Sequence, residues 1–266
     1  MQLKELLIRT LTGVSLIVLV AGSILLGPIT FSAVLLLVYL LGVKELFGLL
    51  QKRELSTRWF RAVPGALLFL VVYAVFELNQ SLLWFILPPA LWLMVALRGG
   101  ITLSGTLAFL WLAIPLSSFF ALGWMEEAPG FQFRLPLFII ALIWINDTFA
   151  YLTGSLVGRH KMTPILSPGK TWEGFAGGML ISLFAGWIIW NSTGIATLWA
   201  WFGISLLVSS LGLAGDLFES GLKRTVKVKN SGELLPGHGG ILDRFDSLLF
   251  VTPAVLILVI LIKLVS

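Results

Sequence analysis

The residues best suited to chemistry lie in one polar stretch, from Asp216 to Asp246, in an otherwise apolar chain. Carboxylates lie near its two ends, cations are spread along it, and its centre is a glycine-rich bend. The carboxylates are Asp216, Glu219, Asp243 and Asp246, and the cations are Lys223, Arg224, Lys227, Lys229 and Arg244. The bend is Pro236-Gly237-His238-Gly239-Gly240. Acidic, basic and flexible backbone groups therefore occur together between two apolar segments of membrane-spanning length.

The spacing of the polar residues predicts two walls of a site. If the helix before the bend continues past its first aspartate, one face carries polar groups at spacings of three and four: Asp216, Ser220, Lys223 and Lys227. After the bend, Asp243 and Asp246 are three apart at the start of the last helix, where the helix dipole supports their ionised state. Paired carboxylates without cysteine favour a hard cation such as Mg²⁺ over zinc.

The bend between these walls has the composition of a phosphate-binding loop. Gly237, Gly239 and Gly240 allow positive φ angles and expose backbone amides that a phosphate can approach. His238 could donate to a phosphate, shuttle a proton or act as a structural donor, and its role stays open. The alternative for the whole stretch is a solvated loop whose charges only retain it on one side of the membrane. Such a loop does not need a glycine-rich bend between paired carboxylates.

Two further polar segments precede this stretch. Asn146 and Asp147 interrupt an apolar helix about 10 Å from its expected cytoplasmic end, so Asp147 is a site candidate, with a helix-assembly ion pair as the alternative. The segment 167–171 predicts a turn that delivers Lys170 and Thr171 to a helix N-terminus, where amides favour an anion. An ordinary helix cap is the alternative for that turn.

The elements that must position these residues are membrane helices. The chain has 266 residues, 58% hydrophobic and 12% charged, which is typical of a polytopic, all-α integral membrane protein. The apolar runs predict about nine transmembrane helices: 10–27, 29–43, 63–77, 81–97, 101–124, 135–154, 174–191, 195–214 and 247–264. We divide the chain into residues 1–134, with five spans, and a catalytic region, 135–266, whose loops 155–173 and 215–246 form a cytoplasm-facing polar pocket.

Small residues recur every fourth position in the seventh span, at Gly174, Gly178, Ser182 and Gly186. This stripe predicts close helix packing and also permits a homodimer.

The distribution of cations predicts the topology. A cytoplasmic N-terminus, which we expect to belong to an uncleaved first helix, places 16 of the 18 lysines and arginines inside and leaves Arg134 and Lys263 outside. Nine spans then put the C-terminus outside. The net charge of +5 is thereby explained by retention and needs no nucleic-acid partner. The five cations between Lys44 and Arg61 are also read as retention charges, with binding of anionic lipid as the alternative.

Metal-binding carboxylates, several cations and a glycine bend are typical of phosphoryl or nucleotidyl transfer. The position at the membrane surface indicates a lipid substrate. The residues by themselves define neither the base nor the lipid.

Three segments resemble one known family. The pattern Ser220-Gly221-Leu222-Lys223-Arg224, followed by 236–246 (PGHGGILDRFD), is similar to the signature of the phosphatidate cytidylyltransferases, also called CDP-diacylglycerol synthases, of the prokaryotic type. The segments 147–151 (DTFAY) and 167–174 (SPGKTWEG) are also similar to that family. Asn230 departs from the pattern, which usually has aspartate there.

The resemblance implies the reaction of CTP with phosphatidate to give CDP-diacylglycerol and diphosphate in phospholipid biosynthesis, at a bacterial inner membrane. It implies a requirement for Mg²⁺, with one or two ions and with Mn²⁺ as a candidate replacement. The expected metal ligands are Asp216, Asp243 and Asp246. The cations expected to neutralise the two substrates are Lys170, Lys223, Arg224, Lys227 and Arg244. The other residues expected in the substrate site are Asp147, Thr171, Ser220, Gly237, His238, Gly239 and Gly240.

Two other functions remain as alternatives. A CTP-dependent lipid kinase of the dolichol kinase type would use similar phosphate-binding groups but transfer the γ-phosphate. A transporter with a polar site at the membrane midplane would use Asp147, but its polar residues should lie within the spans rather than at their cytoplasmic ends.

Overall fold

The computed structural model describes residues 3–52, 57–99, 102–164, 166–237 and 239–265. The N-terminal part consists of α1 (Leu3–Leu26), α2 (Pro28–Gln51), η1 (Trp59–Ala62), α3 (Val63–Phe76), η2 (Leu82–Ile86), α4 (Leu87–Gly99), α5 (Leu103–Thr106), η3 (Leu107–Ala113), α6 (Ile114–Ala121) and η4 (Leu122–Trp124). The C-terminal part consists of α7 (Arg134–Val157), β1 (Lys161–Thr163), β2 (Ser167–Thr171), α8 (Trp172–Thr193), α9 (Leu198–Thr225) and α10 (Leu242–Val265).

The all-α, polytopic fold class is confirmed. Seven helical segments in the described part of the chain are long and apolar enough to cross a membrane. Two shorter apolar helices, Thr10–Leu26 and Leu82–Arg98, correspond to the first and fourth predicted spans. The helices extend beyond the apolar runs, since α7 continues to Val157 and α10 begins at Leu242. The helical backbone continues beyond the predicted spans, so hydropathy places the end of α7 a few residues too early and the start of α10 a few residues too late.

The turn between α1 and α2 depends on a glycine. Gly27 has a φ of 113°, a conformation that L side chains rarely adopt, and Pro28 directly follows it at the start of α2. Pro28 needs no hydrogen-bond acceptor at the first helical position, so α1 and α2 are joined by a single residue.

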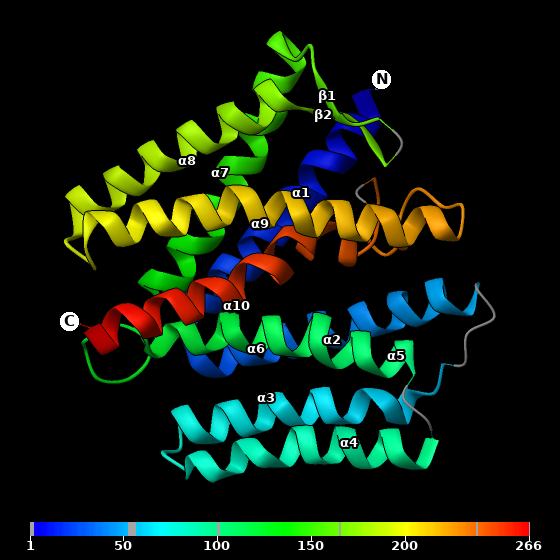
Figure 1. Ribbon diagram of the computed structural model, residues 1–266, viewed down its shortest axis with the longest axis vertical. Coiled ribbons are helices and arrows are strands. Elements are labelled where there is room, and N and C mark those ends of the chain that lie inside the picture. The colour runs from blue at the N-terminus through cyan, green and yellow to red at the C-terminus, as the bar shows by residue number, and fades with distance from the viewer. Residues whose placement is uncertain (1–2, 53–56, 100–101, 165, 238, 266) are drawn as a thin grey trace.

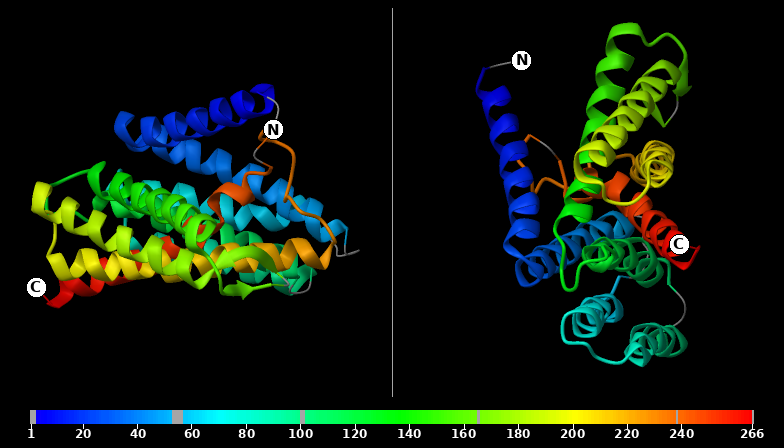
Figure 2. Two further views of the ribbon diagram at one scale, coloured as in Figure 1. Left: turned by 90° about the horizontal axis from the view of Figure 1, so that it is seen from above. Right: turned by 90° about the vertical axis from the view of Figure 1, so that its left-hand side faces the viewer.

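The core joins both halves of the chain. Figure 1 shows α10 between α9 and α6, with α3 and α4 on one side of the bundle and α7 and α8 on the other. Phe31 of α2 packs edge-on against Phe119 of α6, with ring centroids 5.1 Å apart. Thr252 of α10 donates to the carbonyl oxygen of Pro115, 2.8 Å away. Figure 2 shows α1 along one side, beside the segment that links α9 to α10.

The small-residue stripe of α8 is used within the chain. Gly174, Gly178, Ser182 and Gly186 are its buried residues. A Cβ atom on Gly178 would lie 2.8 Å from the carbonyl oxygen of Asn146 on α7, and one on Gly186 would lie 2.7 Å from Ser205 Oγ on α9. The predicted close packing is therefore confirmed. Because α7 and α9 occupy the stripe, it gives no support to the homodimer that the sequence permitted.

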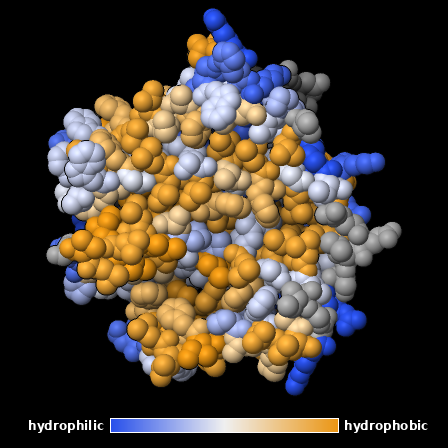
Figure 3. Space-filling view, in the orientation of Figure 1, coloured by the Kyte–Doolittle hydropathy of each residue, from blue (hydrophilic) through white to orange (hydrophobic). Residues whose placement is uncertain are grey.

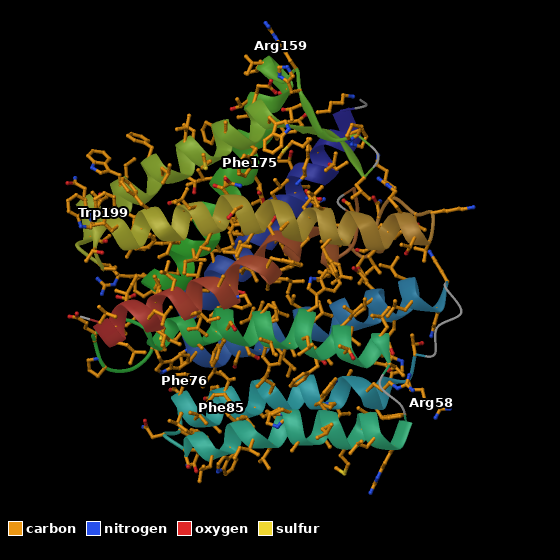
Figure 4. All side chains as sticks on the ribbon, viewed as in Figure 1. Arg58, Phe76, Phe85, Arg159, Phe175 and Trp199 are labelled. Carbon is orange, nitrogen blue, oxygen red and sulfur yellow. The ribbon has the colours of Figure 1, made fainter. Side chains whose placement is uncertain are left out.

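Hydrophobic and hydrophilic residues occupy different parts of the surface of the bundle. Hydrophobic residues cover most of the face in Figure 3, and strongly hydrophilic residues lie at its margins. Arg58 lies at one end of the bundle, whereas Phe76 and Trp199 lie at the opposite end (Figure 4). The two cations predicted to be external both contact Glu126: Arg134 by an ion pair of 2.6 Å and Lys263 through the Glu126 carbonyl oxygen at 3.4 Å.

Candidate active site

A polar cavity of about 530 Å³ lies among α7, β2, α8, α9 and the start of α10. Ten of the predicted site residues line it: Asp147, Lys170, Thr171, Ser220, Asp216, Lys223, Arg224, Asp243, Arg244 and Asp246. Residues 147 and 246 are about a hundred positions apart in the sequence, so tertiary packing is what brings them together. Their meeting in one cavity supports a shared substrate site.

One face of α9 supplies the first wall, as the spacing predicted. The helix continues to Thr225, and Ser220 Oγ donates to Asp216 Oδ1 over 3.2 Å. Lys227 does not belong to this face, because it lies beyond the end of α9 with a φ of 56°. The helix ends before it, so the prediction of four residues on one face holds for three.

Lys223 is the centre of the site. Its side chain is 9% exposed, and Nζ donates to Glu219 Oε2 at 2.8 Å and to Asp243 Oδ1 at 2.5 Å. Glu219 is fully buried, and within the described residues its second oxygen has no hydrogen-bond partner. One lysine thus pairs with two carboxylates, and the ion pairs link α9 to the first turn of α10.

Asp243 has a different environment from the metal ligand that the sequence predicted. Its Oδ1 accepts from Lys223, and its Oδ2 accepts from the backbone amides of Ser231 and Gly240 at 2.9 and 2.8 Å. Both oxygens are therefore already used to orient Lys223 and the glycine bend. Asp243 fits the role of a metal ligand poorly and the role of an organising carboxylate well.

Three other carboxylates meet with fewer cations. Asp147, Asp216 and Glu219 all repel Asp246 electrostatically, and Asp246 accepts from the adjacent amide of Ser247 at 2.8 Å. Asp216 forms an ion pair with Lys170 of β2. Among the described residues, no three acidic or histidine side chains are arranged to hold one metal ion. Mg²⁺ commonly binds through one or two carboxylates plus substrate phosphates, so Asp216 and Asp246 fit such an ion.

The segment predicted to be a turn is a β-strand. β2 pairs antiparallel with β1, with Lys161 opposite Thr171 and Thr163 opposite Ser167. The residue before Pro168 is biased towards extended backbone, which favours the strand. The expected delivery to the helix start is confirmed: Lys170 faces the cavity, and Thr171 is the N-cap of α8, accepting from the amide of Gly174 at 3.1 Å. Thr171 thus serves as the helix cap that was considered as the alternative.

The glycine bend borders a second cavity of about 480 Å³, whose wall of Lys229, Asn230 and Arg244 is shared with the first. Gly237 and Gly239 line it and have φ angles of 74° and 84°, as expected. The amide of Gly240 instead donates to Asp243, so this glycine does not offer the free amide that was predicted. His238 lies outside the described residues.

Asp147 belongs to a network that ties the helices together. It lies ten residues, or about 15 Å, before the end of α7, deeper than predicted because α7 is longer. Ser247 donates to it over 3.4 Å, and the neighbouring Asn146 accepts from Ser209 of α9 over 2.7 Å. Asp147 thus lines the cavity and also joins α7 to α10, through a serine hydroxyl rather than through the ion pair considered as the alternative.

Two residues of the site were not predicted from the sequence. Glu45 of α2 accepts hydrogen bonds from Ser231 Oγ and from the amides of Ile241 and Leu242. The sequence offered one signal for Glu45, a carboxylate close to the end of the apolar run 29–43. Its position next to Lys44, outside the predicted span, indicated a loop residue instead. Ser231 lies inside the signature stretch but outside the matched motifs.

The comparisons with known proteins agree with this geometry. A sequence profile of the "Cytidylyltransferase family" matches residues 7–262. The phosphatidate cytidylyltransferase of Staphylococcus epidermidis is 32% identical over 269 residues, which cover 95% of this chain and 98% of that protein. The enzymes of the same name from Staphylococcus saprophyticus and Staphylococcus aureus (strain COL) are 50% identical over 126 residues and 46% identical over 135 residues. These matches cover 47% and 50% of this chain, and 48% and 51% of those proteins. With a profile match over nearly its whole length, the chain belongs to the cytidylyltransferase family.

Proposed function

We propose that this protein is a phosphatidate cytidylyltransferase, which converts CTP and phosphatidate to CDP-diacylglycerol and diphosphate. The observation that carries the proposal is the cavity in which Lys170, Lys223 and Arg244 meet the carboxylates of α9 and α10. The family match and the names of the relatives support cytidylyl transfer rather than the lipid kinase or the transporter.

The cavity suits two phosphate-bearing substrates. An oxygen of the phosphatidate phosphate attacks the α-phosphorus of CTP, and a new P–O bond forms. The bond from the α-phosphorus to the bridging oxygen breaks, and its electron pair leaves with diphosphate. A phosphomonoester is already ionised near neutral pH, so the attack needs little help from a general base. Catalysis is then mostly positioning and charge neutralisation, which Lys223, Arg224 and Arg244 provide from the cavity wall.

A magnesium ion would be held by Asp216 and Asp246. Bound there, Mg²⁺ would neutralise part of the charge on the triphosphate. Two carboxylates are enough for an ion that also binds substrate oxygens. Asp243 would instead keep Lys223 directed at the phosphates.

The lipid substrate would enter from the membrane. Tyr151, Phe175 and Leu213 also line the cavity and can cover the start of the acyl chains. We propose that the protein lies in the bacterial inner membrane with the N-terminus and the catalytic loops in the cytoplasm and the C-terminus outside. The lysine and arginine distribution and the pairing of both external cations with Glu126 support this orientation.

The test uses the purified full-length chain with phosphatidate, Mg²⁺ and CTP labelled either in cytidine or in the γ-phosphate. Cytidine label should enter the lipid, and the γ-label should appear in diphosphate. Transfer of only the γ-label to lipid would establish the kinase instead. Parallel reactions with ATP, GTP and UTP, and one without phosphatidate, show whether the nucleotide and the lipid are both recognised. No labelled lipid with any of the four nucleotides would refute the proposal.

A further inference from the structure

A buried glutamate from the N-terminal half contacts the segment that follows α9. Glu45 of α2 is 7% exposed. Its Oε1 accepts from the Ile241 amide at 2.9 Å, and its Oε2 accepts from the Leu242 amide at 3.1 Å and from Ser231 Oγ at 2.9 Å. The first amides of a helix have no acceptor within that helix, so a carboxylate at the start of α10 satisfies them.

The same contacts extend to the catalytic lysine. Ser231 Oγ lies 2.9 Å from Glu45 Oε2 and 3.0 Å from Asp243 Oδ2, so this hydroxyl lies between the two carboxylates. Asp243 in turn holds Lys223, and Lys223 holds Glu219. A continuous polar chain therefore runs from α2 through the start of α10 to α9. It connects the N-terminal helices to the cation at the centre of the cavity.

Glu45 also leaves no room for a side chain at Gly232 or at Gly240. A Cβ atom on Gly232 would lie 2.7 Å from Glu45 Cδ, and one on Gly240 would meet Glu45 at the same distance. On α1, Thr12 Oγ1 donates to the carbonyl oxygen of Pro236 over 3.1 Å. The N-terminal helices thus contact residues 231–232 and 240–242 on the two sides of the bend, and Pro236 within it.

We propose that Glu45 is a positioning residue for the transfer reaction. It fixes residues 231–232 and 240–242, on the two sides of the bend, so that Asp243 keeps Lys223 directed at the substrate phosphates. This role rests on the proposed function, and it assigns to the N-terminal half a part in the site beyond membrane anchoring. A misplaced Lys223 should weaken charge neutralisation in the transition state more than it weakens substrate binding, to which other cations contribute.

The first experiment compares Glu45→Gln with the wild-type chain and with Glu77→Gln, a control at the far end of α3. Glutamine keeps the size, but its amide group places N–H donors opposite at least one backbone donor. We expect kcat to fall at least about tenfold, as for the loss of a hydrogen bond to a charged group, and KM for CTP to stay within about threefold. The control should keep both constants. Wild-type kcat in a folded Glu45→Gln variant would overturn the proposal.

A second variant separates positioning from a general loss of packing. Ser231→Ala removes only the bridging hydroxyl and should also lower kcat. If Glu45 acts through Ser231, the double variant should be no slower than Glu45→Gln, whereas independent effects multiply. Multiplying effects would refute the chain from Glu45 to Lys223.

A readout without substrate tests the same contact. Lys227 and Lys229 are exposed next to the held segment, so trypsin cleavage after them, followed by fragment mass, reports its opening. Glu45→Gln should raise this cleavage rate at least about tenfold, and Glu77→Gln should leave it unchanged. Faster cleavage with unchanged turnover would show a contact that the reaction does not need and would overturn the positioning role. An inactive wild-type chain would instead overturn the proposed function.

Discussion

Replacing Lys223 with methionine should reduce both stability and turnover, for two separable reasons. Methionine keeps most of the volume of the side chain but removes the charge that Glu219 and Asp243 share. Glu219 is fully buried, and one of its oxygens already has no hydrogen-bond partner among the described residues. Removing one partner of a buried ion pair costs about 3–5 kcal/mol, so we expect a clear fall in the melting temperature.

The catalytic loss should have a different origin. Lys223 lines the cavity, where we propose that it neutralises the charge that develops on the transferring phosphate. Removing one such donor costs about 10²–10³ in turnover. Adding Glu219→Gln to Lys223→Met removes the stranded charge and should recover part of the melting temperature, but it supplies no cation and should leave turnover low.

The two quantities can be measured on the same preparations. Tryptophan fluorescence of the detergent-solubilised protein, which has 11 tryptophans, follows thermal unfolding, and labelled CTP follows formation of CDP-diacylglycerol. The single variant Glu219→Gln is the control, since it keeps the lysine and its pairing with Asp243. If the double variant regained wild-type turnover, Lys223 would serve only to neutralise Glu219, and its role towards phosphate would be refuted. An unchanged melting temperature in Lys223→Met would contradict the buried ion-pair argument.

Three other predictions test the orientation, the departure from the family pattern and the metal site. The chain has no cysteine, so single cysteines at Lys52 and Asn230 should be shielded from an impermeant maleimide on intact cells, whereas one at Glu127 should react. The reverse pattern would invert the topology. Asn230→Ala should keep turnover within about tenfold, because Asn230 replaces the usual carboxylate and needs to hold no metal. A hundredfold loss in a folded protein would contradict this. Asp246→Asn should raise the Mg²⁺ concentration for half-maximal activity about tenfold or more. Asp243→Asn should lower turnover with little change in that concentration, because its oxygens already accept from Lys223 and two amides. An unchanged Mg²⁺ requirement in Asp246→Asn would place the ion elsewhere.

Much of the fold could be predicted because the membrane imposes a local rule. About 20 consecutive apolar residues are enough to mark a span, and no knowledge of distant contacts is needed. The spacing on α9 and the glycine bend are local patterns as well, and both were found as expected, apart from Lys227 and Gly240. The placement of Lys227 on the face of α9 was wrong because the end of a helix depends on the loop that follows it. The free amide predicted for Gly240 was wrong because that amide donates to Asp243, a contact that residue spacing does not reveal.

The assignment of roles within the cavity could not be predicted in the same way. Asp243 and Asp246 are equivalent in a sequence pattern, as two carboxylates three apart at a helix start. In the folded chain, Asp243 is enclosed by Lys223, Ser231 and Gly240, whereas Asp246 faces other carboxylates. The difference arises from which neighbouring element each side chain meets.

The sequence by itself determined the membrane class and most of the charged residues that line the cavity, because hydrophobic length and motif spacing are properties of consecutive residues. Only the tertiary structure decided that α7 and α9 occupy the small-residue stripe and that Glu45 holds the start of α10. These contacts join residues as far apart as 45 and 242, and each depends on how the helices pack. A hydrogen bond needs its two atoms within about 3 Å, and for residues so distant in the chain only the packed fold sets that distance.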